Sequence, residues 1–150
     1  MKVKVEVIGD REILRAMENL SKEKSKLVKG EVYATGLDVQ TEAREKLRES
    51  RTWDQGNLAT SIIVDPKHGG MTADVGPEAP YAPYVEHGTR PHFPPMDALE
   101  GWAKRHGFAS AWPICKAIAD RGLKARPFMF PAWLAFKDLF WKRIRRILER

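Results

Sequence analysis

The stretch VKGEVYATGLDVQTEAREKL, residues 28–47, places apolar or small residues at intervals of three or four positions. This spacing is typical of one buried face of an α-helix, and the opposite face reads as charged. It predicts a long amphipathic helix from about Lys22 to Ser50. Gly30 and Gly36 each lower helix stability by about 0.5 to 1 kcal/mol relative to alanine, which favours either the close approach of another backbone or a kink. The predicted buried face consists of Val28, Val32, Gly36, Val39, Ala43 and Leu47.

Upstream of this helix, the segment Lys2–Ile8 alternates valine with charged residues. Period-two alternation is typical of a half-buried β-strand. Gly9 ends the strand, and Asp10 is suited to cap a helix that stops near Ser21. The apolar positions of this helix are Ile13, Leu14, Met17 and Leu20.

Downstream of the long helix, turn residues precede a predicted strand over Leu58–Val64. Residues Met71–Val75 are its predicted hairpin partner, and Tyr84 with Val85 suggests a further extended piece. The connections are too short for crossover helices, so we expect about four strands in a mostly antiparallel sheet.

Two short helices are predicted within residues 94–126, over MDALEGWAKRHG and PICKAIADRG, each entered through proline and left through glycine. A C-terminal amphipathic helix begins near Pro131. The predicted fold is therefore α+β: about four strands, mostly antiparallel, against the long helix and the C-terminal helix. Residues 1–150 form one domain in this interpretation, with 94–126 as a helical insertion. Trp102 and Trp112 either anchor a neighbouring protein or fill a small local core.

Composition sets broad limits on function. The chain has 150 residues, one cysteine and a formal net charge of +6. A lone Cys115 favours an intracellular origin and a buried apolar role. We find no signal peptide or membrane span, so we expect synthesis in the cytoplasm without membrane contact. The modest positive charge fits nucleic acid, an acidic partner or solubility alone.

The sequence offers little sign of catalysis. Its histidines, His68, His87, His92 and His106, lack the helical pairing that zinc sites show, so we expect no metal and no cofactor. Glu86 and His87 point to opposite faces if they lie in a strand, which excludes an acid and base pair between them. Glu86 is better explained by pairing with Arg90 or with backbone N–H groups. We predict no enzymatic activity, although residues assembled from distant segments are an alternative that sequence leaves open.

The C-terminal helix combines aromatic and basic residues. At helical spacing, rings such as Trp133, Phe136 and Trp141 are more often core than platforms for base stacking. The arginines are Arg143, Arg146 and Arg150, which a helical wheel groups on one exposed side. A small DNA-binding protein that uses this helix is therefore the alternative function.

Three separated motifs occur in order along the chain: WDQGNLATSI, YAPYVEHGT and ARPFMFPAW. Together they resemble the tail-component family of long-tailed bacteriophages, whose members include tail-completion or neck proteins. Gln55 stands where the family usually has threonine, the proline expected near Arg51 is missing, and His87 stands where an aromatic residue is common. The motif positions that match and carry the predicted scaffold and contact roles are Gly56, Leu58, Ser61, Tyr81, Tyr84, Glu86, Gly88, Thr89, Pro127, Phe128 and Pro131.

The resemblance implies a non-enzymatic virion protein made in the host bacterial cytoplasm. It implies a homo-oligomeric ring, six-fold by family resemblance, in the neck that joins head and tail. Implied partners are neighbouring neck and head-completion proteins and a tail-tube or tail-terminator protein. It also allows non-specific contact of Arg143, Arg146 and Arg150 with genomic DNA.

Overall fold

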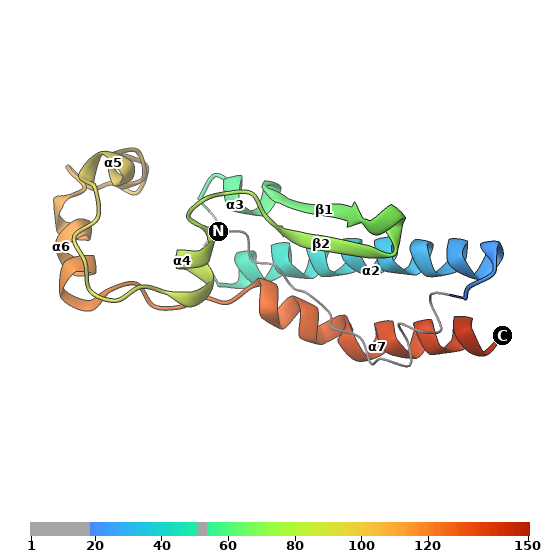
Figure 1. Ribbon diagram of the computed structural model, residues 1–150. Coiled ribbons are helices and arrows are strands. Elements are labelled where there is room, and N and C mark those ends of the chain that lie inside the picture. The colour runs from blue at the N-terminus through green and yellow to red at the C-terminus, as the bar shows by residue number, and fades with distance from the viewer. Residues whose placement is uncertain (1–18, 51–53) are drawn as a thin grey trace. The chain divides into compact units, whose positions relative to one another are not determined.

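The computed structural model describes residues 19–50 and 54–150, which form two compact units. One unit comprises the chain up to Pro80 together with Phe128–Arg150, and the other is Tyr81–Pro127. Across the described residues there are six α-helices and one antiparallel sheet of two strands (Figure 1). The α+β class is confirmed. The predicted strand at Lys2–Ile8 and nearly all of the helix that follows it lie outside the described residues.

Helix α2, Lys22–Glu49, is the long helix predicted from the sequence. Ser21 begins it as N-cap, because its hydroxyl accepts a hydrogen bond from the Lys24 backbone N–H at 3.3 Å. All six residues of the predicted apolar face are buried. The prediction is therefore confirmed in both boundaries and burial.

The two glycines of α2 have different surroundings. A methyl group added at Gly36 would lie 2.7 Å from Cγ1 of Val64, so only glycine allows the sheet to approach the helix this closely. An added methyl at Gly30 would meet no atom within 4 Å. Packing among the described residues therefore explains Gly36 but gives no reason for Gly30.

The sheet is a hairpin of β1, Ile62–Lys67, and β2, Thr72–Pro77. Its ladder runs from the pair Ile62 and Pro77 to the pair Lys67 and Thr72. The turn between the strands is the short helix η1, His68–Gly70, in which all three residues have positive φ. Pro66 lies inside β1, contrary to the predicted end of the strand at Val64, and both strands of a two-stranded ribbon are edges that tolerate proline.

The prediction of about four strands is wrong for the described part of the chain, which has two. The start of the predicted strand at Leu58 is instead α3, Asn57–Thr60, and the predicted extended piece at Tyr84 and Val85 is α4, Ala82–His87. Pro83 lies in the first turn of α4, where its missing N–H costs nothing and its fixed φ favours the helix.

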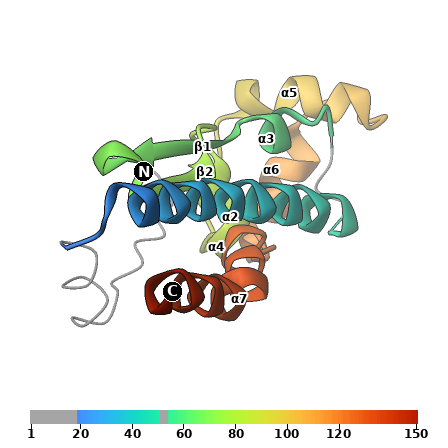
Figure 2. The same cartoon turned by 90° about the vertical axis from the view of Figure 1, so that its right-hand side faces the viewer.

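Helix α7, Met129–Glu149, packs along α2. Both views show α2 between this helix and the β1–β2 hairpin (Figures 1 and 2). Val28, Val32 and Ile144 form the buried contact between the two helices, with Phe140 and Ile147 partly buried around it. Phe136 and Phe140 are half-buried rather than fully buried, so the apolar face of the C-terminal helix is only partly covered.

The second unit contains α4, α5 at Met96–Arg105 and α6 at Trp112–Arg121. Both predicted insertion helices are confirmed, within two residues at each end. Ala103, Ala111 and Cys115 are buried at the contact between α5 and α6, with Met96, Leu99 and Ile114 partly buried around them. Cys115 is the buried apolar residue that the sequence suggests.

Candidate functional site

The first motif joins the two ends of the β1–β2 hairpin. Gly56 has φ of 77°, a left-handed conformation that favours glycine, and it begins α3, in which Leu58 is buried. The Ser61 hydroxyl donates to the Leu58 carbonyl at 2.8 Å and accepts from the Ala79 N–H at 3.3 Å. The Ser61 carbonyl also accepts from the Glu78 N–H at 2.9 Å. The residues before β1 and after β2 are thereby held together, which is a scaffold role.

Two polar side chains of α2 complete this junction. Arg44 Nε donates to the Ala59 carbonyl at 3.0 Å, and its Nη2 donates to the Ile62 carbonyl at 3.2 Å. Gln40 Nε2 donates to the same Ile62 carbonyl at 2.6 Å. These bonds satisfy carbonyls where α3 ends and β1 begins, a place that sequence spacing alone did not identify.

The second motif is divided between surface and interior. Tyr81 and Tyr84 are exposed, whereas Glu86 on the same short helix is only 3% exposed. Because α4 is helical, Glu86 and His87 do not point to opposite faces as a strand would require. The motif thus presents two tyrosines outward while its carboxylate is enclosed.

Gly88 and Thr89 close the base of the insertion. The Thr89 N–H donates to the Leu123 carbonyl at 2.9 Å, and the Leu123 N–H donates back to Thr89 at 3.2 Å. A methyl group at Gly88 would overlap the Leu123 carbonyl oxygen, and one at Gly122 would overlap the Thr89 carbonyl oxygen. Both glycines have positive φ. Two backbone segments therefore cross at a distance that only glycine permits.

The third motif begins α7. Phe128 is fully buried at the N-cap position, and Pro131 is half-buried in the first turn, where proline fits a helix. Pro127 is exposed and is the last residue of the second unit. The motif therefore includes the boundary between the second unit and the first.

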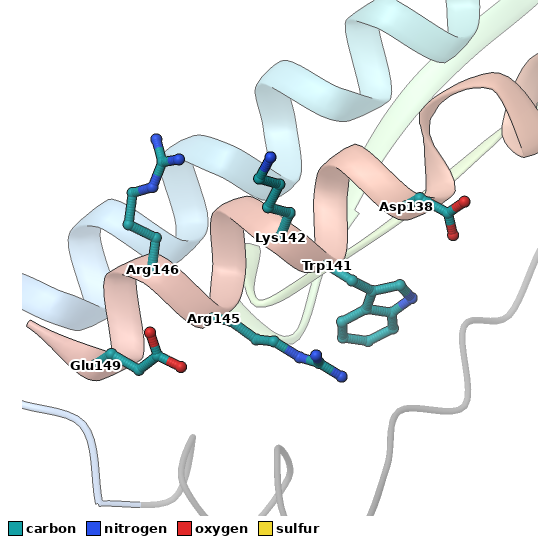
Figure 3. Close-up of a pocket in the computed structure, with 6 residues that line it drawn as sticks. All are labelled: Asp138, Trp141, Lys142, Arg145, Arg146 and Glu149. Carbon is teal, nitrogen blue, oxygen red and sulfur yellow. The ribbon is translucent and has the colours of Figure 1, made fainter.

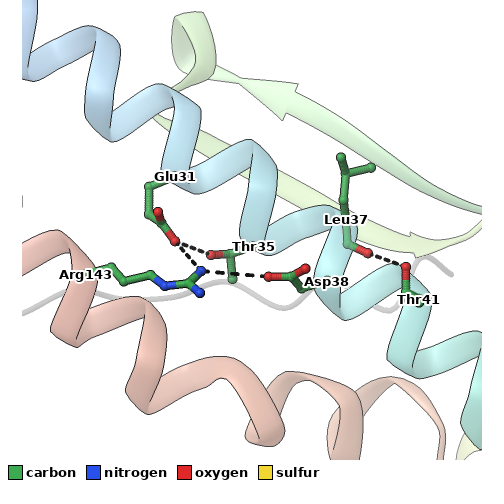
Figure 4. Close-up of polar contacts among 6 residues, drawn as sticks. All are labelled: Glu31, Thr35, Leu37, Asp38, Thr41 and Arg143. Atoms are coloured by element: carbon green, nitrogen blue, oxygen red, sulfur yellow. Dashed lines mark hydrogen bonds and ion pairs between the residues drawn. The ribbon is translucent and has the colours of Figure 1, made fainter.

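The three C-terminal arginines do not share one environment. Arg143 Nη1 lies 2.9 Å from Glu31 Oε1 and 3.9 Å from Asp38 Oδ2, both on α2 (Figure 4). The Thr35 hydroxyl donates to the same Glu31 oxygen at 3.1 Å. The Arg143 guanidinium thus offsets part of the negative charge of two carboxylates. Its main role is to join α7 to α2.

Arg146 instead lines an open hollow along α7 (Figure 3). The hollow is lined by three cations, Arg146 among them, by two carboxylates and by the half-buried ring of Trp141. This mixture suits a charged protein surface or weak contact with phosphate. Arg150 is exposed at the end of the chain. The lining side chains are Asp138, Trp141, Lys142, Arg145, Arg146 and Glu149.

The sequence predicts a charged outer face for α2, but in the structure this face is not uniformly charged. Its middle carries exposed, uncharged residues that recur at helical spacing on one side, and Leu27 and Leu37 are 53% and 39% exposed. We call this surface the outer strip. Its signal in the sequence is a repeat of alternating three- and four-residue steps beside the buried face. The outer strip consists of Leu27, Gly30, Tyr33, Ala34, Leu37 and Thr41.

A model of the bacteriophage HK97-gp10 tail-component family matches residues 11–88, slightly more than half of the chain. This chain belongs to the HK97-gp10-like tail-component family. The resemblance drawn from the three motifs is thereby confirmed at the level of the family. No curated protein and no solved structure matched the chain.

In this HK97-gp10-like chain, the family match includes the first motif and α4 and ends at Gly88. The match therefore ends at Gly88, where the two backbone segments cross. The rest of the second unit lies beyond the matched region. Within the described ranges, no helix is both long and apolar enough to span a membrane. The same residues contain no group of three or more His, Cys, Asp or Glu side chains placed to hold a metal ion.

Proposed function

We propose that this chain is a non-enzymatic structural subunit of a tailed-phage virion. Copies assemble into a ring in the neck, six by family resemblance, and the ring joins head and tail. Its neighbours are neck, head-completion and tail-tube or tail-terminator proteins. Membership of the tail-component family supports the class of protein, and the outer strip supports subunit assembly.

The outer strip supports the proposal most directly, because packing among residues 19–50 and 54–150 gives no reason for its glycine, Gly30. Gly30 costs about 0.5 to 1 kcal/mol of helix stability relative to alanine, and the space above it is open. The neighbouring side chains are apolar or small, with Leu27 and Leu37 exposed on either side. A second molecule that lies close to the α2 backbone would bury these residues and account for the glycine.

A ring requires each subunit to use two different surfaces, because head-to-tail contacts close only when the rotation between copies permits. The outer strip is one such surface, and it packs against another part of the neighbouring copy. Isolated subunits remain monomeric in this proposal until the head or tail surface brings them together. The outer side of α7 then faces a neighbour or makes weak, non-specific contact with DNA.

Substitution at Gly30 separates assembly from folding. Gly30→Gln should raise the free energy of unfolding of the isolated subunit by about 0.5 to 1 kcal/mol, because glutamine favours helix and meets open space. The same side chain should prevent close approach of a neighbour and reduce the yield of infectious particles. Urea unfolding and complementation of a phage that lacks the gene measure the two effects.

Lys22→Gln, an exposed change on the same helix but before the outer strip, serves as the control and should leave particle yield unchanged. Normal particle yield with Gly30→Gln would remove the outer strip from the assembly contact. Absence of the chain from purified particles would refute the virion role as a whole.

Charge reversal on α7 should distinguish Arg143, which is paired with α2, from the surface residues Arg146 and Arg150. Arg143→Glu should lower the free energy of unfolding by about 1 kcal/mol, a value reduced by partial exposure, because it places a third carboxylate beside Glu31 and Asp38. Arg146→Glu combined with Arg150→Glu should leave stability unchanged and impair head-to-tail joining or DNA passage. Equal stability losses in the two variants would contradict the structural role of Arg143.

A further inference from the structure

Helix α7 carries an exposed strip of its own, on a side that differs from its contact with α2. Phe130 and Leu134 are 59% and 50% exposed, and the half-buried Trp141 follows at helical spacing. Steps of three or four residues place side chains on one side of a helix. The contact with α2 is centred on another position, Ile144. We call this surface the α7 strip: Phe130, Leu134, Lys137, Trp141 and Arg145.

The outer strip of α2 has a shape that fits such side chains. Four of its residues occupy positions i, i+3, i+4 and i+7, which together form a hole for one side chain of a facing helix. Two of the four are small, and a methyl group added at Gly30 would meet no atom within 4 Å. A large apolar side chain such as Leu134 therefore fits this hole. Its residues are Gly30, Tyr33, Ala34 and Leu37.

The direction of the two helices limits how copies can meet. Within one chain α2 and α7 are antiparallel, because Lys24 Nζ donates to the Leu148 carbonyl at 2.9 Å and Arg143 pairs with Glu31 further along both helices. Adjacent copies in a ring of six are related by a rotation of about 60°, which turns a helix by no more than that angle. The α7 of one copy therefore still runs mostly opposite to the α2 of the next copy.

We propose that the α7 strip of each copy packs antiparallel on the outer strip of the next copy. The pairing rests on the proposed function, because a ring needs two different surfaces on each subunit. Leu134 enters the hole beside Ala34, and Trp141, two turns later, covers Leu27, two turns earlier on the neighbouring helix. Packing of two outer strips on each other would instead leave Phe130 and Leu134 exposed.

Opposite charges extend the two strips at the same end of this contact. Glu23 precedes Leu27 by one turn, and Arg145 follows Trp141 by one turn, so antiparallel packing brings their side chains together. Figure 3 shows Arg145 on the same side of α7 as Trp141. Both charged residues are exposed, and neither takes part in an ion pair among the described residues.

Cross-linking of cysteines in purified particles tests this pairing. A phage that lacks the gene is supplied with two versions of the chain, one with Ala34→Cys and one with Leu134→Cys and a C-terminal tag. After oxidation we expect a product that contains both versions, since a disulfide forms only when the two Cα atoms lie within about 7 Å. Native Cys115 is buried and should not take part. A chain with both substitutions should give a ladder of products that ends at the size of the ring.

Ala135→Cys is a matched control for Leu134→Cys, because it is the next residue, is exposed and points to a different side of α7. Combined with Ala34→Cys, it should give at least about tenfold less product. Products that join only two Ala34→Cys chains would overturn the inference in favour of an α2–α2 contact. So would particles that contain the chain but give no cross-link, a result that leaves the proposed virion role intact. Absence of the native chain from particles would refute both.

Exchange of the two charges gives a second test with a different readout. Glu23→Arg and Arg145→Glu, each alone, should lower the yield of infectious particles by about two- to fivefold, because like charges then meet at the contact. The chain with both substitutions should recover this yield, because opposite charges face each other again. Thermal unfolding of each isolated variant checks that it folds. Losses that add up in the double variant would contradict the pairing of Glu23 with Arg145.

Discussion

Phe128→Ala should lower the free energy of unfolding of the first unit by about 3 to 5 kcal/mol, the usual cost of removing a fully buried phenylalanine ring. Among the described residues, Phe128 is the largest side chain with no exposure, and Met129 and Ala132, which follow it in the sequence, are also buried. Since small proteins are stable by only about 5 to 15 kcal/mol, this loss would bring the unit close to unfolding at room temperature. Urea denaturation followed by far-ultraviolet circular dichroism measures it.

The neighbouring Phe130 offers a matched control, because it is the same residue type two positions later and is 59% exposed. Phe130→Ala should change the free energy of unfolding by no more than about 0.5 kcal/mol. Equal losses for Phe128→Ala and Phe130→Ala would show that the third motif is not anchored by burial. Phe128→Leu should recover most of the stability, since it restores much of the lost volume.

The elements that sequence predicts well are those with many periods or strong boundary residues. Helix α2 repeats its apolar positions from Val28 to Leu47, which is more than five turns at about 3.6 residues per turn, so this period outweighs any local preference. Helices α5 and α6 are shorter, but a proline at the start of each and a glycine soon after the end of each mark their boundaries. For these segments, local chemistry and the final structure agree.

Short segments are predicted poorly because few residues specify them. Tyr84 and Val85 favour a strand by residue type, yet Pro83 in the first turn and Gly88 at the end give a six-residue helix. Likewise, the hydroxyl groups of Thr60 and Ser61 donate to the carbonyls of Asn57 and Leu58 in α3, so the strand begins later than its β-branched residues suggest.

The role of a surface side chain depends on which element packs against its helix, and a single sequence does not show this. A helical wheel groups Arg143 with Arg146, but only the fold brings Glu31 against Arg143. The motif residues Gly56, Ser61 and Gly88 were identified by resemblance, and the structure supplies their physical reasons. The sequence left two roles for Trp102 and Trp112 open, and the structure gives a stacked, half-buried Trp102 and an exposed Trp112.

Gly122→Ala should open the base of the insertion. Gly122 has φ of 72° and ψ of −168°, a region that is essentially restricted to glycine and costs other residues about 1 to 3 kcal/mol. The added methyl would also overlap the Thr89 carbonyl oxygen, which belongs to backbone and has little room to move. The combined cost should exceed about 3 kcal/mol and break the hydrogen bonds between Thr89 and Leu123. Amide hydrogen exchange at these two residues should accelerate at least about a hundredfold.

Gly107→Ala isolates the conformational part of this effect. Gly107 also has a positive φ, 81°, but an added methyl there would meet no atom within 4 Å. It should therefore cost only about 1 kcal/mol and leave exchange at Thr89 and Leu123 unchanged. If Gly122→Ala behaves like Gly107→Ala, the close crossing does not hold the insertion. Backbone conformation alone would affect Gly107 and Gly122 alike. If only Gly122→Ala exposes residues 89–127 to proteolysis, the crossing of the two backbone segments at Gly88 and Gly122 therefore holds this part of the chain together.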